Sequence, residues 1–113
     1  ASPYAIHNTL VAWGESIKAG VVSQVPCGIV DVTPTVLQLL GIAPPQGIDG
    51  RVLRELLVGG PDPRDLAVSH SERRVRLEGA WGAADQVAHY SAVDDHTYLD
   101  KITWSESDSG GLP

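Results

Sequence analysis

A short apolar helix with marked ends is the feature that most constrains the fold of this chain. Thr33 followed by Pro34 predicts its start, because threonine caps free amides and proline is tolerated in a first turn. Gly41 predicts its end, and Pro44 with Pro45 behind it cannot continue a helix. The residues between these ends include Val36, Leu37, Leu39 and Leu40. We therefore expect a helix of roughly two to three turns whose apolar face is buried against a sheet.

Short elements are also predicted on both sides of this helix. Residues 9–13 are apolar and stop at a glycine, and residues 21–24 form a second extended run, so both are predicted to be strands. Asp49, Gly50 and Arg51 predict a turn in which the glycine takes a positive φ. Residues 52–57 are then apolar enough for a short amphipathic helix.

A β-hairpin is predicted near the C-terminus. Residues 86–93 and 96–104 alternate between polar and apolar side chains, and Asp94 with Asp95 joins them. The mixture of short strands and helices favours an α/β class, with this hairpin as an antiparallel edge of the sheet or as a small sheet beside it.

The charge balance narrows the class of partner. The net charge is -6, which argues against binding to nucleic acid or to an anionic membrane surface. The basic residues Arg73, Arg74 and Arg76 alternate with Val75 and Leu77, so we interpret them as a solvated strand or loop face. No apolar run is long enough to span a bilayer, and no membrane span is expected.

Residues 30–42, Val-Asp-Val-Thr-Pro-Thr-Val-Leu-Gln-Leu-Leu-Gly-Ile, resemble a signature near the C-terminus of alkaline phosphatase superfamily enzymes. In that signature an Asp, a Pro-Thr pair and a leucine-rich helix precede Asp-Gly-Arg, which is Asp49-Gly50-Arg51 here. Residues 2–10, 90–93 and 98–100 are similar to segments of the type I phosphodiesterase and nucleotide pyrophosphatase branch. Sulfatases and phosphonate hydrolases share variants of the signature, so it indicates the superfamily better than the branch.

The resemblance implies an α/β fold, in which this chain is the C-terminal portion of an alkaline phosphatase-like sandwich with a terminal antiparallel hairpin. Residues 1–104 would belong to the hydrolase domain, and residues 105–113 are expected to be a disordered tail. The parent protein would hydrolyse a small phosphodiester or pyrophosphate. It would use two divalent metal ions, zinc in this branch, one to activate a Ser, Thr or formylglycine nucleophile and one to stabilise the leaving oxygen.

We expect the chain alone to be an inactive fragment. It has 113 residues, begins with Ala1 and contains no methionine. By the resemblance, the nucleophile and nearly all metal ligands lie in the N-terminal part of the fold, so no catalytic residue or metal ligand is assigned here. The substrate-binding residues and the compartment stay open. Two alternatives also stay open: a fragment of a sulfatase, and a non-catalytic structural or interaction module that keeps the scaffold.

Histidines are the tempting metal ligands. His7 would follow the histidine-glycine turn that binds metal in the family, which makes it a candidate ligand. Its neighbours match the entry to a strand instead, so we interpret it as a structural residue or one that orients a ligand. His89 and His96 fall on the predicted hairpin, where His89 pairs across strands and His96 lies beside the turn. A zinc site at these positions is not expected.

Acidic residues also have plain structural interpretations. Asp31 stands just before a helix start, where capping and the helix dipole favour a negative charge. Asp49 is interpreted as a turn residue whose carboxylate binds backbone amides. Asp94 and Asp95 resemble paired catalytic carboxylates, but at the tip of a hairpin they are expected to be solvated.

Potential nucleophiles are likewise discounted. Ser69 and Ser71 flank His70, but the strand-turn-helix context that exposes a catalytic serine is missing around them. Cys27 lies between a proline and a glycine, so we interpret it as a small buried or turn residue rather than as a catalytic thiol.

Overall fold

The computed structural model describes residues 7–106 and divides the chain into two compact units. Among the described residues, the first unit contains 7–9, 70–91 and 99–106, and the second contains 10–69 and 92–98. The helical elements are the 3-10 turns η1 (Ile29–Asp31), η2 (Arg54–Leu56) and η3 (Pro63–Asp65) and the α-helix α2 (Val32–Leu39). The strands are β1 (Ser69–Gly79), β2 (Gly82–Val93) and β3 (His96–Glu106).

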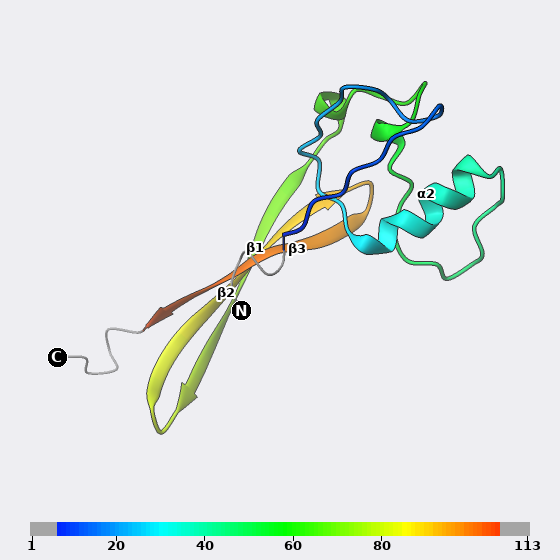
Figure 1. Ribbon diagram of the computed structural model, residues 1–113. Helices are drawn as coiled ribbons and strands as arrows, with labels where there is room; N and C mark the ends of the chain where they lie inside the picture. The colour runs from blue at the N-terminus through cyan, green and yellow to red at the C-terminus, as the bar shows by residue number, and fades with distance from the viewer. Residues whose placement is uncertain (1–6, 107–113) are drawn as a thin grey trace. The chain divides into compact units, whose positions relative to one another are not determined.

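The three strands form one antiparallel sheet in the order β1-β2-β3, and they lie side by side in Figure 1. Pairs of side chains fix the register of β1 on β2: Arg76 with Asp85, Glu72 with His89, and His70 with Ser91. Apart from Leu77, every residue of β1 is exposed. Arg73, Arg74 and Arg76 therefore lie on a solvated strand, which is one of the two predicted alternatives.

The hairpin predicted over residues 86–104 is confirmed and is longer than expected, because β2 begins at Gly82 and β3 continues to Glu106. Asp94 and Asp95 have φ values of 49° and 67°, the left-handed pair that matches a two-residue turn to the twist of the strands. Strand β3 extends through Ser105 and Glu106, the first two residues of the predicted tail, and residues 107–113 of that tail lie outside the described residues.

The predicted helix is present, and its end is where the sequence places it. Gly41 has a φ of 71°, the Gly41 amide donates to the Gln38 carbonyl, and the Ile42 amide donates to the Leu37 carbonyl. These two bonds are the pattern that closes a helix on a left-handed glycine. The start differs slightly, because α2 begins at Val32 and Thr33 lies inside the first turn rather than capping it. No helix between residues 7 and 106 is long and apolar enough to cross a membrane.

The apolar face of α2 is not covered by a sheet, which contradicts our expectation. Leu40 is 65% exposed, and Val36 and Leu39 are also exposed. The residues that α2 buries are Pro34 and Thr35 at its start. Polar contacts at its first turn, rather than an apolar stripe, therefore anchor this helix within its unit.

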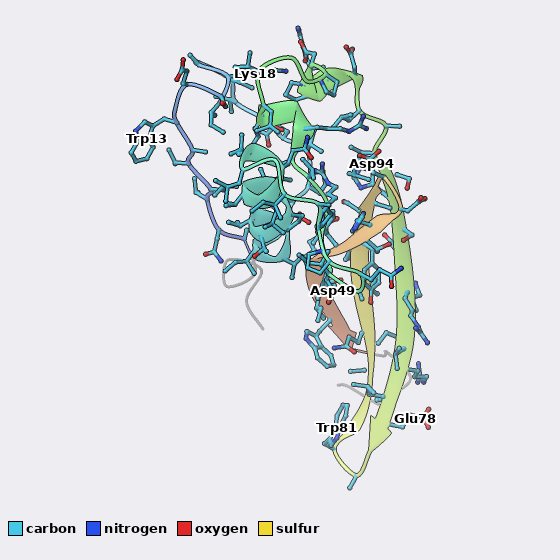
Figure 2. All side chains as sticks on the ribbon, turned by 90° about the vertical axis from the view of Figure 1, so that its right-hand side faces the viewer. Trp13, Lys18, Asp49, Glu78, Trp81 and Asp94 are labelled. Atoms are coloured by element: carbon cyan, nitrogen blue, oxygen red, sulfur yellow. The ribbon has the colours of Figure 1, made fainter. Side chains whose placement is uncertain are left out.

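The predicted α/β sandwich is contradicted, because the described chain is mostly a three-stranded antiparallel sheet with one short helix. Residues 9–13 and 21–24 are coil rather than strands, and residues 52–57 contain only the 3-10 turn η2. Trp13 is 86% exposed and projects away from the chain in Figure 2. Apolar runs become central strands only where neighbouring strands supply hydrogen bonds, and the described residues offer these two runs no such neighbours.

Candidate functional site

The signature residues meet in a buried polar network, and the Asp31 carboxylate is at its centre. Asp31 is 0% exposed. Its Oδ2 atom accepts hydrogen bonds from the Gly28 amide at 2.8 Å and from the Tyr98 hydroxyl at 2.7 Å. Its Oδ1 atom accepts one from the Arg51 amide at 2.7 Å. One carboxylate therefore joins the start of η1, the turn that contains Gly50, and β3.

The Arg51 side chain extends the network from the other side. Its Nη1 and Nη2 atoms donate to the two carboxylate oxygens of Glu55 at 2.9 and 2.8 Å. Nη2 also donates to the Pro26 carbonyl at 2.8 Å, and Nε donates to the Tyr98 hydroxyl at 3.0 Å. Arg51 and Glu55 are both buried. A buried pair of this kind is costly to break, because removing one partner leaves an unpaired charge away from water.

Thr35 connects the helix to the same turn. Its hydroxyl donates to the Asp31 carbonyl at 2.7 Å and accepts from the Leu53 amide at 2.9 Å. The threonine of the Pro-Thr pair thus bonds α2 to the segment that follows Arg51. Between residues 7 and 106, no buried side-chain nitrogen or oxygen lacks a hydrogen-bond partner.

Gly50 is required by the close approach of two backbone segments. Its φ is 92°, and a Cβ atom at this position would lie 2.2 Å from the Val30 carbonyl oxygen. The predicted positive φ in this turn is confirmed, and the contact gives a second reason for glycine. Asp49 is exposed, so the residue of the Asp-Gly-Arg triplet that enters the network is Arg51.

The pKa values of two network residues, Arg51 and Tyr98, are shifted away from neutral pH. Burial lowers the pKa of the Arg51 guanidinium, but the hydrogen bonds and the negative charge of Glu55 outweigh that effect and raise its pKa above the usual value. Burial, followed by the hydrogen bond to Asp31, raises the pKa of Tyr98 well above its usual range. Arg51 therefore stays charged and Tyr98 stays neutral, which suits positioning rather than acid-base chemistry.

A second polar cluster lies in the first unit, where Ser91 stands between a histidine and a carboxylate. The Ser91 Oγ atom is 3.1 Å from the His70 Nδ1 atom and donates to the Asp100 carboxylate at 2.5 Å. In a nucleophilic triad the carboxylate orients the histidine and the serine is open to substrate. Here the carboxylate binds the serine itself, and Ser91 is only 2% exposed. The three residue types of a catalytic triad are present, but the carboxylate is bonded to the serine and not to the histidine.

An open hollow of about 710 Å³ lies beside this cluster, and His7, His70 and His89 are among its lining residues. The His7 Nε2 atom is hydrogen-bonded to the Asp100 carbonyl oxygen. His89 pairs across strands as predicted, with Nδ1 3.3 Å from Glu72 and Nε2 3.2 Å from Thr103. Within the part of the chain that the structure describes, no group of three or more His, Cys, Asp or Glu side chains is arranged to hold a metal ion.

Three other residues singled out from the sequence, Asp94, Asp95 and His96, lie at the turn between β2 and β3. His96 Nδ1 bonds to the Asp94 carbonyl oxygen at 2.9 Å, beside the turn as expected. Asp94 and Asp95 are exposed, and the Asp94 carboxylate forms an ion pair with Arg54 at 2.9 Å. The prediction of solvated turn residues is therefore confirmed.

Two potential nucleophiles are unsuited to catalysis as they stand. Ser71 lies on the exposed strand β1 and not at a strand-turn-helix corner. Cys27 is exposed, so of the two predicted roles, a buried or a turn residue, burial is excluded. Desolvation and the negative charge of Asp31 raise the pKa of the Cys27 thiol, which disfavours the reactive thiolate.

Two members of the network, Glu55 and Tyr98, were not predicted from the sequence. Glu55 had a usable signal, because it follows Arg51 by four residues, the spacing at which opposite charges meet on a helical turn. Tyr98 is 67 residues from Asp31, and no local pattern connects them.

Replacing Asp31 with asparagine is expected to destabilise the chain by about 3 kcal/mol. One carboxylate oxygen becomes an NH₂ group, so at least one buried donor of Gly28, Tyr98 or Arg51 then faces another donor. Urea unfolding followed by circular dichroism measures the change. Asp49→Asn, at an exposed neighbouring aspartate, is the matched control and is expected to leave the unfolding midpoint unchanged. Equal midpoints for both variants would contradict the role given to Asp31.

Tyr98 is expected to make stability depend on alkaline pH. The pKa of Tyr98 is raised in the folded state. Its contribution to the free energy of unfolding is therefore complete below the pKa of an unfolded tyrosine, about 10, and is lost as pH rises through the pKa of the folded state. Tyr98→Phe should lower the unfolding free energy by about 1–3 kcal/mol at pH 7. Because the phenol is gone, the variant should also lose stability less steeply above pH 10.

Urea unfolding at a series of pH values tests this expectation. Tyr90→Phe, at a half-buried tyrosine of the neighbouring strand β2, is the control. If Tyr98→Phe and the unchanged chain showed parallel pH profiles, Tyr98 would not be the group responsible.

Comparisons with family models, with curated proteins and with solved structures find no match for this chain. What bears on its function is therefore the signature itself and the contacts among its residues. Asp31, Thr35 and Arg51 stand at separate places in the sequence, yet each is bonded to the same turn or to its immediate neighbours.

Proposed function

We propose that this chain is a C-terminal segment of a metal-dependent hydrolase of phosphodiesters or pyrophosphates in the alkaline phosphatase superfamily. The observation that carries the proposal is that three polar residues of the signature, Asp31, Thr35 and Arg51, lie in one buried network. Asp31 accepts from the Arg51 amide, and the Thr35 hydroxyl joins the Asp31 carbonyl to the Leu53 amide. Their bonds give a physical reason for the signature to occur as a unit.

The part of this segment in the proposed enzyme is structural. Asp31, Arg51 and Glu55 are buried and already bonded to protein groups, so their side chains are engaged within the fold rather than presented to a substrate. The nucleophile and the two divalent metal ions, which would activate it and stabilise the leaving oxygen, are expected from other parts of the enzyme.

Exposed apolar side chains support the view that more protein surrounds the second unit. Val36 and Leu39 of the helix and Leu40 just after it are exposed, as are Val11 and Trp13 in the preceding coil. Large apolar side chains left open to water are typical of surfaces that contact another protein part. In the proposed enzyme, the helix and this coil would contact the remainder of the hydrolase domain.

The test is hydrolysis by the product of the whole gene that encodes this sequence. We expect it to hydrolyse bis(4-nitrophenyl) phosphate, to lose activity on treatment with EDTA and to regain it when Zn²⁺ is added. Turnover of 4-nitrophenyl sulfate in place of the phosphodiester would favour the sulfatase alternative. The absence of both activities from a folded, zinc-loaded protein would favour a non-catalytic module and contradict the proposal.

The 113-residue chain provides the control. It is expected to turn over neither substrate and to show no tight zinc binding by isothermal titration calorimetry. Hydrolysis of the phosphodiester by this chain alone would place catalytic groups within it and contradict a purely structural role.

A further inference from the structure

Strand β1 is an accessible edge with an unusual arrangement of charge. It is the first strand in the order β1-β2-β3, so one side of its backbone has no neighbouring strand among the described residues. It is 11 residues long, and all of them except Leu77 are exposed. An edge of this length presents a row of free backbone donors and acceptors that another strand can pair with.

Charged residues of both signs lie along one face of β1. Successive residues of a strand point to opposite faces, and the contacts of His70, Glu72 and Arg76 with β2 place these three on the same face. The full set on this face, by the same alternation, is His70, Glu72, Arg74, Arg76 and Glu78. Glu72 and Arg76 lie at equal distances on either side of Arg74, and so do His70 and Glu78, so Arg74 is the centre of this set.

We propose that β1 pairs in an antiparallel manner with β1 of a second copy of this chain, with Arg74 of each copy opposite Arg74 of the other. A two-fold axis then places Glu72 opposite the second copy's Arg76, and His70 opposite the second copy's Glu78. Each of these pairs occurs twice. The Glu72–Arg76 pair brings opposite charges together across strands, and the His70–Glu78 pair brings an imidazole beside a carboxylate with which it can form a hydrogen bond. The proposal does not depend on the hydrolase function.

Charge also selects this register over its neighbours. Shifting the centre by one residue toward the C-terminus puts Glu72 opposite Glu78 and Arg74 opposite Arg76, so like charges meet at four positions. Shifting it toward the N-terminus puts Glu72 opposite Arg74 and His70 opposite Arg76. Of these three registers, the one centred on Arg74 is the only one that places Glu72 opposite an arginine and His70 opposite a carboxylate, with a single Arg–Arg pair at the axis. Because one strand pair buries little surface, we expect a weak and reversible dimer.

Cysteine cross-linking tests the register. In a Cys27→Ser background, Arg74→Cys should form a disulfide-linked dimer under mild oxidation, because opposite residues satisfy the required Cα separation of about 4.4–6.8 Å. Ser71→Cys is the control on the same strand. In the proposed register the two copies of position 71 are six residues out of step, or about 20 Å apart. The Ser71→Cys variant should therefore stay monomeric on non-reducing gels. Equal cross-linking of both variants, or of neither, would overturn the proposal.

Sedimentation equilibrium gives a second test without a cross-link. Arg74→Thr removes the like-charge pair at the axis and should tighten the dimer several-fold. Arg73→Thr removes the same charge one residue away, on the face where no arginine lies opposite it, and should not tighten the dimer. Association that is unchanged by Arg74→Thr, or tightened equally by both variants, would show that the copies meet elsewhere, for example through the exposed apolar side chains of the second unit.

Discussion

The buried carboxylate of Asp31 is the interaction on which the second unit depends. A carboxylate removed from water is costly unless hydrogen-bond donors surround it, and here the donors come from Gly28, Arg51 and Tyr98. Arg51 and Tyr98 are distant from Asp31 in sequence, so satisfying one charge brings three segments together. The Arg51–Glu55 pair and the Thr35 hydroxyl then extend the same network. Polar contacts take over the anchoring role that we expected an apolar helix face to perform.

Local features of the fold were predictable because their causes are local. Gly41 ends the helix and Gly50 takes a positive φ, since both positions need a backbone conformation that other residues adopt at a cost. The turn at Asp94 and Asp95 was predicted on the same basis. The strands expected over residues 9–13 and 21–24 were wrong, because a strand depends on neighbours that local sequence does not reveal.

The candidate site shows the same division between local and distant causes. Asp31 was expected to cap the helix that follows it, but its side chain makes no capping bond to α2. Its bond from the Gly28 amide caps the preceding turn η1 instead. Its bonds to Arg51 and Tyr98 depend on chain segments far away in sequence and were not predicted. Ser91, His70 and Asp100 likewise meet only through strand register. A signature can therefore indicate which residues belong together without indicating whether they catalyse or support.

Amide hydrogen exchange at the network is the most direct test of its central role. The amides of Arg51 and Leu53 donate to Asp31 and Thr35, although the segments around them are turns and coil. If the network holds the unit together, these two amides exchange only through global unfolding, with the same free energy as urea denaturation reports. Exchange of both at the rates of unprotected loop amides would contradict this account.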